Sequence, residues 1–389
     1  MSRLRRAQWL PAYAFVVVML GTTLPTPLYP EYEREFGFSH LLITVIFAVY
    51  AAGVILALLL LGGLSDQAGR RPVLLASILL SAASAVAFLL AGGLWPLLVG
   101  RVLSGLSAGI CTGTATAALV DLAAPGRRSQ ASALATAANL GGLGCGVLLA
   151  GVLATVAAAP LRLPFWVDLA LLVPAFGAVT WMAEPVRRTG RPRLVPQRLR
   201  VPRRLRATFV RAGAAGAAAF AMFGLFSAVA PTFIATYLHE TSPALAGGVV
   251  FVLFASSAVG QLAVPRIRGR LALPAGCAVL IAGALLTAAA LAASSLGLLF
   301  GAAIVLGAGQ GLAVGSGLAA LNAGTPAELR GEVDSSYFVA AYAGVSVPII
   351  GVGLLSQVTG LRDAAYALIA VVTAVTAASL AGLARHGFR

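Results

Sequence analysis

Long apolar runs recur along the whole chain and are separated by short polar stretches. A helix needs about 20 apolar residues to cross a bilayer, and twelve runs reach that length. They cover residues 9–29, 40–62, 72–92, 95–120, 130–156, 165–183, 209–238, 244–264, 272–293, 297–321, 335–356 and 364–384. Lipid cannot satisfy open backbone groups, so each run is expected to be a helix rather than a strand of a barrel. The pattern predicts an all-α integral membrane protein with twelve transmembrane helices.

The composition favours a bilayer over water as the solvent. Of the 389 residues, 60% are hydrophobic and only 10% are charged, whereas soluble domains average about 25% charged residues. Arg3, Arg5 and Arg6 precede the first apolar run, as in a signal peptide. That run ends in Thr-Pro rather than in a small-residue cleavage site, and further spans follow it. We therefore expect a retained first helix.

Arginine is distributed unequally between the two sides that the spans define. With the N-terminus inside, 23 of the 27 basic residues, all of them arginine, fall on the inner side. Three fall on the outer side, namely Arg34, Arg162 and Arg362. Basic loops stay on the cytoplasmic side, so both termini are predicted to be cytoplasmic. The absence of lysine is typical of a GC-rich genome, so we expect a multi-pass protein of the bacterial cell membrane.

A polar stretch rich in Pro and Arg divides six spans from six. It covers residues 185–206 and reads PVRRTGRPRLVPQRLRVPRRLR. We expect two six-helix bundles, at 1–184 and 207–389, joined by this cytoplasmic linker. A basic run can bind nucleic acid. The favoured interpretation is a connector that fixes topology and touches anionic lipid, so no nucleic-acid partner is expected.

The two halves resemble each other in sequence. The Gly105/Gly109 pair of the fourth span aligns with Gly307/Gly311 of the tenth, and each span runs on to a proline-containing loop that ends in arginine. A duplicated six-span unit is how one large class of transporters forms two bundles around a site at mid-membrane.

The loop between the second and third spans carries the most specific pattern, GGLSDQAGRRP, beginning at Gly62. Gly62 and Gly69 permit close helix approach and a tight turn. Asp66 at the membrane surface needs positive neighbours, and Arg70 lies four residues further on. Asp121, at the inner end of the fourth span, is placed to hold Arg70 from the other side.

This loop resembles the signature G-x-L-a-D-r-x-G-R-R of the major facilitator superfamily, with Gln67 in place of the usual basic residue. The resemblance covers essentially the whole chain and is closest to twelve-span bacterial drug/proton antiporters. It implies a latch that locks the halves in the outward-facing state, formed by Gly62, Asp66, Gly69, Arg70, Arg71 and Asp121. It also implies that Asp66 faces the start of the eleventh helix, expected near Asp334. The second half has Val264 in place of the acid, so the latch is expected to be one-sided. The alternative is a solvated loop whose charges only set topology.

Arg101 and Asp168 fall within spans, where a charge is costly and usually functional. Arg101 matches the family's helix 4 arginine, which in proton-coupled members takes part in proton transfer or substrate binding. The alternative is that Arg101 snorkels to the outer surface, about 9 Å away at ~1.5 Å per residue. Asp168 is the best embedded carboxylate, since the first span carries no acid. A coupling or substrate role is considered for both residues.

Small residues recur in the fifth span. Gly142, Gly146 and Gly151 match the family's antiporter motif G-x-x-x-G-P-x-x-G-G, whereas Val147 and Ala150 depart from it. Glycines four apart allow close packing, which is expected here between the fifth and eighth helices. The match favours export, and the alternative is generic packing by small residues.

A substrate path is expected between the halves at mid-membrane. The candidate lining residues carry hydroxyl, amide or aromatic groups, and they are Thr22, Thr26, Asn139, Phe223, Phe226, Gln310, Tyr337 and Tyr342. Aromatic residues at helical spacing more often belong to packing. If they line the path, the cavity is broad and apolar and suits an amphipathic molecule.

The leading hypothesis is secondary active transport by alternating access, with proton-coupled export of small amphipathic or lipophilic compounds. The alternative is proton-coupled uptake of a small metabolite. An enzyme would need clustered His, Asp or Glu at one membrane face, and the sequence has no such cluster. A receptor would need a soluble domain or a large loop, and the sequence has neither. The cysteines and histidines are scattered, so no metal or cofactor is expected and the proton gradient is the driving force. The expected partners are a small-molecule substrate, protons and the lipid bilayer, and a monomer is expected.

Overall fold

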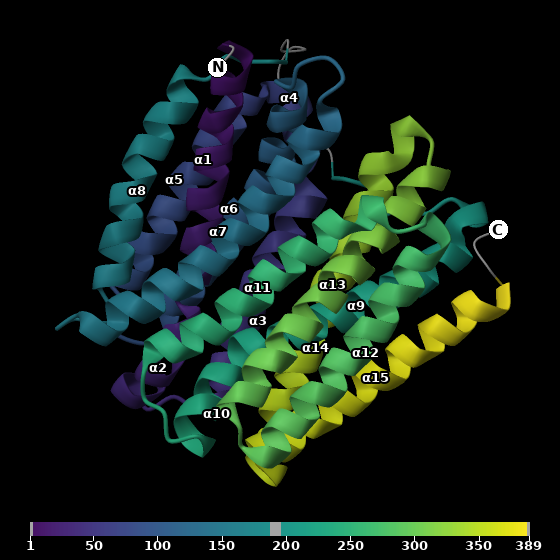
Figure 1. The fold of residues 1–389 in the computed structure, drawn as a ribbon. Helices are drawn as coiled ribbons and strands as arrows, with labels where there is room; N and C mark the ends of the chain where they lie inside the picture. Colours follow the sequence, from purple (N-terminus) through teal and green to yellow (C-terminus); the bar gives the residue numbers. More distant parts are fainter. Residues whose placement is uncertain (1–2, 187–195, 387–389) are drawn as a thin grey trace.

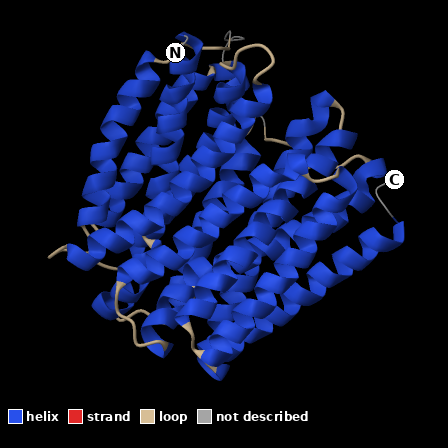
Figure 2. Ribbon diagram, viewed as in Figure 1, coloured by secondary structure: helices blue, strands red, loops and turns tan. Residues whose placement is uncertain are grey.

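The computed structural model describes residues 3–186 and 196–386. Within these residues all regular structure is helical (Figure 2), as the hydropathy pattern predicts. The first half contains α1 (Arg3–Thr23), η1 (Thr26–Leu28), α2 (Tyr29–Phe36), α3 (His40–Leu61), α4 (Leu64–Ala68), α5 (Arg70–Leu89), α6 (Leu94–Asp121), α7 (Arg128–Val156) and α8 (Leu163–Trp181). The second half contains η2 (Arg203–Leu205), α9 (Arg206–Ala228), α10 (Ala230–Tyr237), α11 (Pro243–Ala263), η3 (Val264–Arg266), α12 (Gly269–Ala293), α13 (Leu296–Gly324), η4 (Ala327–Leu329), α14 (Arg330–Thr359) and α15 (Leu361–His386).

Twelve stretches of these helices are long and apolar enough to cross a membrane, in the predicted order. The eleventh begins earlier than expected, because α14 starts at Arg330 and not near Asp334. Glu332 in its first turn lowers the local hydropathy but suits the positive end of a helix dipole. Residues 187–195 of the expected linker lie outside the described residues, and 196–202 are not helical.

The first and seventh spans are broken near the same end of the molecule. After α1 the chain passes Pro25 and resumes as α2, and after α9 it turns at Val229 and resumes as α10, with Pro231 near its start. Proline lacks an N–H and clashes with the preceding turn, so it interrupts a helix. Glu31 and Glu33 lie in α2. The break at Pro25 therefore has a counterpart in the second half.

Equivalent glycines hold equivalent helices together in the two halves. A Cβ added at Gly105 in α6 would overlap the carbonyl oxygen of Tyr50 in α3. A Cβ added at Gly307 in α13 would likewise overlap the carbonyl oxygen of Leu253 in α11. The sequence repeat therefore marks one helix contact made twice, between the second and fourth spans and between the eighth and tenth.

The two halves meet along two antiparallel helix pairs, α3 with α14 and α7 with α11, and through α2 with α10 (Figure 1). A Cβ at Gly353 would overlap Thr44, and one at Gly151 would overlap the Pro243 carbonyl oxygen. These tight contacts lie toward one end, here called the Arg-poor end, which carries Arg34, Arg162 and Arg362. The opposite end, here called the Arg-rich end, carries Arg70, Arg71, Arg127, Arg128 and Arg330. The halves are therefore packed directly on each other toward the Arg-poor end.

Candidate latch and transport site

Arg70 lies at the centre of the polar loop at the Arg-rich end. Its Nη1 is 2.6 Å from Asp66 Oδ1 and its Nε is 3.0 Å from Asp121 Oδ2. Nη1 also donates to Ser65 Oγ at 2.6 Å. The Asp66 side chain is 68% exposed, and among the described residues its ion pair is with Arg70 and not with α14. The structure thus contains the expected contacts within the first half, while the expected contact with the eleventh helix is not made.

Glu184, which follows the last helix of the first half, also binds this loop. Its Oε1 accepts from the backbone N–H of Arg70 at 2.8 Å, and its Oε2 accepts from that of Arg71 at 2.9 Å. Free N–H groups and the helix dipole favour an anion at the start of α5. Gly69 has φ +99°, and a Cβ there would lie 2.5 Å from Glu184 Oε2. Sequence reasoning missed Glu184, although a lone acid directly after the sixth span was a visible signal.

We expect Glu184→Ala to lower the melting temperature of the purified protein. The lost helix cap is worth on the order of 1–2 kcal/mol. Glu184→Gln keeps one acceptor oxygen, so its melting temperature should lie between those of the wild type and Glu184→Ala. Glu328→Ala is the matched control, because Glu328 is exposed at the same end. Equal melting temperatures for Glu184→Ala and the control would contradict the capping role.

Arg101 is buried inside the first half and does not reach the outer surface. It is 1% exposed, its Nη1 donates to the Thr22 carbonyl oxygen at 2.9 Å, and its Nη2 donates to the Tyr29 hydroxyl. The guanidinium carbon lies 5.4 Å from the ring centroid of Tyr29 and 5.7 Å from that of Phe88, within the range of cation–π attraction. The snorkelling alternative is wrong, because all of these contacts point into the bundle.

Asp168 in α8 is also buried, at 1% exposure. Its Oδ1 has no hydrogen-bond partner within the described residues. The carboxyl faces α1 at Gly21, where a Cβ would lie 2.8 Å from Oδ2. Arg101 binds the next residue of α1, Thr22, and in the described chain no ion pair joins Arg101 to Asp168. The buried cation and the buried acid therefore contact consecutive residues of the same helix.

Tyr50 in α3 links this charged centre to the second half. The Arg101 guanidinium carbon lies 6.0 Å from the Tyr50 ring centroid. The Tyr50 hydroxyl lies close to the side chains of Thr22 and Tyr342, and Tyr342 belongs to α14. Tyr342 packs edge-on against Phe220, with ring centroids 5.3 Å apart. Thr22 and Tyr342 were predicted from the sequence, whereas Tyr50 was missed because a single Tyr in an apolar run carries no local signal.

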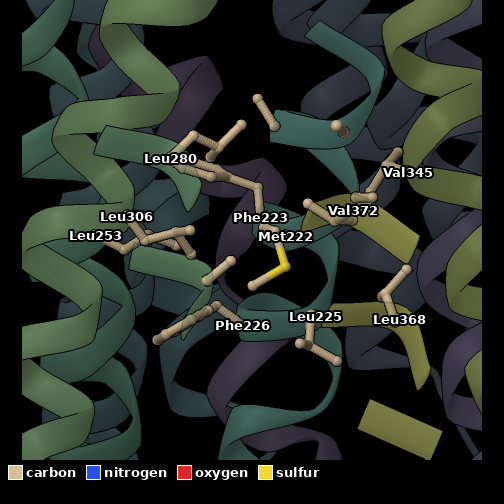
Figure 3. Close-up of a cluster of buried hydrophobic side chains, with 14 of the residues drawn as sticks. Met222, Phe223, Leu225, Phe226, Leu253, Leu280, Leu306, Val345, Leu368 and Val372 are labelled. Carbon is tan, nitrogen blue, oxygen red and sulfur yellow. The ribbon is translucent and has the colours of Figure 1, made fainter. Parts of the chain in front are cut away.

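Four other predicted cavity residues, which belong to the second half, are buried among packed side chains. Gln310 is 3% exposed and accepts from Ser257 in α11. Tyr337 is fully buried, and its hydroxyl is 3.4 Å from the Val314 carbonyl oxygen. Phe223 and Phe226 belong to the hydrophobic cluster drawn in Figure 3. Gln310 and Tyr337 thus contact helices of their own half, whereas the cluster of Phe223 and Phe226 also contains Ala51, Leu140 and Val147 of the first half. Their place along a substrate path stays a prediction.

The remaining two cavity candidates differ in exposure. Thr26 lies in η1 at the break of the first span and is 2% exposed. Asn139 in α7 is half-buried. Of the eight candidates, Thr22 and Tyr342 are the two that the structure joins to the charged centre.

The glycines of the predicted antiporter motif divide between two neighbours. A Cβ at Gly142 would lie 2.6 Å from the Val16 carbonyl oxygen, and one at Gly146 would overlap the Leu20 carbonyl oxygen, both in α1. Gly151 packs on α11, as expected. The expectation that Gly142 and Gly146 also pack on the eighth span is wrong, because they lie on the face of α7 that approaches α1.

Twelve spans in two similar halves, with a buried charged centre beside their interface, define a membrane transporter. The chain belongs to the Major Facilitator Superfamily, whose family model matches residues 12–348. It is a multi-pass membrane protein of that family.

Individual relatives are distant. The chain is 31% identical over 181 residues to the multidrug resistance protein MdtL of Salmonella paratyphi B, covering 44% of this chain and 42% of that protein. It is 29% identical over 153 residues to the class H tetracycline resistance protein of Pasteurella multocida, covering 39% of this chain and 37% of that protein. These matches span less than half of the length of either relative. A D-xylose-proton symporter structure has TM-score 0.77 at 13% identity, covering 100% of this chain and 98% of that one, which shows a shared fold.

Proposed function

We propose that this transporter exports small amphipathic or lipophilic compounds across the bacterial cytoplasmic membrane in exchange for protons, by alternating access. The observation that carries the proposal is the pair of buried ionisable residues, Arg101 and Asp168, against consecutive residues of α1. Ionisable groups inside a membrane protein mark ion and substrate pathways. The relatives named for multidrug and tetracycline resistance favour export over uptake.

In the proposed cycle Asp168 carries the proton. A carboxylate buried without a donor is costly, so the protonated and ionised forms favour different positions of α1 against α8. Arg101 holds α1 through Thr22, and a shift of α1 therefore reaches Tyr50 and its contact with Tyr342 in the other half. The compound enters from the Arg-rich end and leaves when the contacts at the Arg-poor end open. The proposed unit is a monomer, and the proton gradient is its energy source.

Whole-cell accumulation of a panel of fluorescent amphipathic compounds tests the direction of transport. Expressing cells are compared with cells that carry Arg101→Ala, each with and without an uncoupler of the proton gradient. Export predicts low accumulation in energised expressing cells and a rise when the uncoupler is added. A fall in accumulation on uncoupling would overturn export and favour the alternative, proton-coupled uptake.

We expect Asp168→Asn to abolish the dependence of transport on an imposed pH gradient in proteoliposomes. Asparagine keeps the shape of the side chain but cannot exchange a proton. Asp363→Asn is the matched control, because Asp363 is exposed near the same end, in the first turn of α15. Transport by Asp168→Asn that still responds to the gradient like the control would remove Asp168 from the proposed cycle.

A further inference from the structure

Gln197 in the linker is inserted between the two halves at the Arg-rich end. It is half-buried, whereas its neighbours Pro196, Arg198, Leu199 and Arg200 are exposed. Its backbone N–H donates to the Leu59 carbonyl oxygen, at 2.6 Å, in the last turn of α3. This contact anchors the linker to the first half.

The Gln197 side chain reaches the second half from that anchor. Its Oε1 accepts from Ser335 Oγ in α14 at 3.0 Å. A Cβ at Gly331, near the start of α14, would lie 3.0 Å from Gln197 Nε2, and one at Gly62 would overlap Oε1. The amide thus occupies the space between the end of α3 and the start of α14.

Along the antiparallel pair of α3 and α14, Gln197 takes the place of a direct helix contact. At the Arg-poor end α3 and α14 are in direct contact, through Thr44 and Gly353. At mid-length Tyr50 meets Tyr342. At the Arg-rich end Gly62 lies twelve residues after Tyr50 and Gly331 eleven before Tyr342, and both glycines face the linker amide. Helices with facing glycines can approach closely when nothing separates them.

We propose that Gln197 is a removable spacer, which holds α3 and α14 apart at the Arg-rich end and must leave before the loop of Asp66 can dock on α14. This inference rests on the alternating access of the proposed function. It assigns the linker a part in the conformational change beyond that of a connector. The exposed Asp66 side chain belongs to the state that the spacer stabilises.

The distance between α3 and α14 tests the spacer without any substrate. Spin labels are attached at Leu60→Cys, which is 42% exposed at the end of α3, and at Glu328→Cys beside the start of α14, in a background lacking Cys111, Cys145 and Cys277. Gln197→Ala should raise the population with the shorter distance by about fivefold, the effect of one lost hydrogen bond. Arg198→Ala, in the exposed neighbouring position, should leave the distribution unchanged. Identical distributions for Gln197→Ala and wild type would overturn the proposal.

A reversible cross-link provides the converse experiment. Gln197→Cys and Ser335→Cys are joined with a short bis-methanethiosulfonate reagent in the same cysteine-free background without spin labels, which should stop transport, and a reducing agent should restore it. A cross-linked protein that transports as fast as the reduced one would overturn the spacer. If the distances respond as expected but the unlinked protein transports none of the tested compounds in either direction, the proposed substrate class fails and the spacer stands.

Discussion

Replacing Arg101 with alanine is expected to abolish coupled transport. The side chain donates to the Thr22 carbonyl oxygen and to the Tyr29 hydroxyl inside the first half. Charge-assisted hydrogen bonds contribute about 1.5–3 kcal/mol each, so losing two corresponds to about a hundredfold or more in rate if they act in the rate-limiting step. Alanine also removes one of the side-chain hydrogen bonds that join α6 to α1.

Arg101→Lys separates the charge from the geometry of the guanidinium. Lysine keeps the positive charge but lacks the planar fork that binds two acceptors at once, so its transport rate should remain far below that of wild type. Arg162→Ala is the matched control, since Arg162 is exposed near the same end. Initial rates in proteoliposomes with an imposed pH gradient are the measurement. Wild-type rates and an unchanged pH dependence in Arg101→Ala would reduce Arg101 to a packing residue.

Replacing Asp66 with asparagine is expected to slow transport strongly while leaving insertion and stability nearly unchanged. In this structure Asp66 is 68% exposed and pairs with Arg70 four residues away. Exposed pairs of this kind contribute about 0–1 kcal/mol to stability. The large effect on transport is expected from the state in which the loop docks on α14, where the helix dipole favours an anion.

Two measurements on the same preparation separate these effects. The melting temperature reports the contact with Arg70, and turnover in proteoliposomes reports the docked state. Asp121→Asn removes the other acid that pairs with Arg70. The Asp121 side chain is less exposed, at 36%, so its loss should lower both the melting temperature and the turnover. Turnover at the wild-type level in Asp66→Asn would show that the loop is only a solvated turn.

The chain alone determined the number and order of the spans and the contacts within the polar loop. Spans are determined by hydropathy summed over about 20 consecutive residues, which is a local property. Asp66 and Arg70 are four residues apart, so helical geometry brings them together. The glycine repeat also indicated a helix contact that the structure contains, because Gly105 packs on α3 and Gly307 on the equivalent helix α11.

The tertiary structure decided which face of each span meets which neighbour. Membrane helices are apolar all round, so hydropathy does not distinguish a face toward lipid from a face toward protein. For that reason the sequence does not indicate that Gly146 packs on α1, or that Tyr337 is buried with its hydroxyl near the Val314 carbonyl oxygen. Glu184 and Gln197 each bind a group more than 110 residues away in sequence. Such contacts depend on how two bundles and a linker are placed in space, and no local pattern of residues encodes that placement.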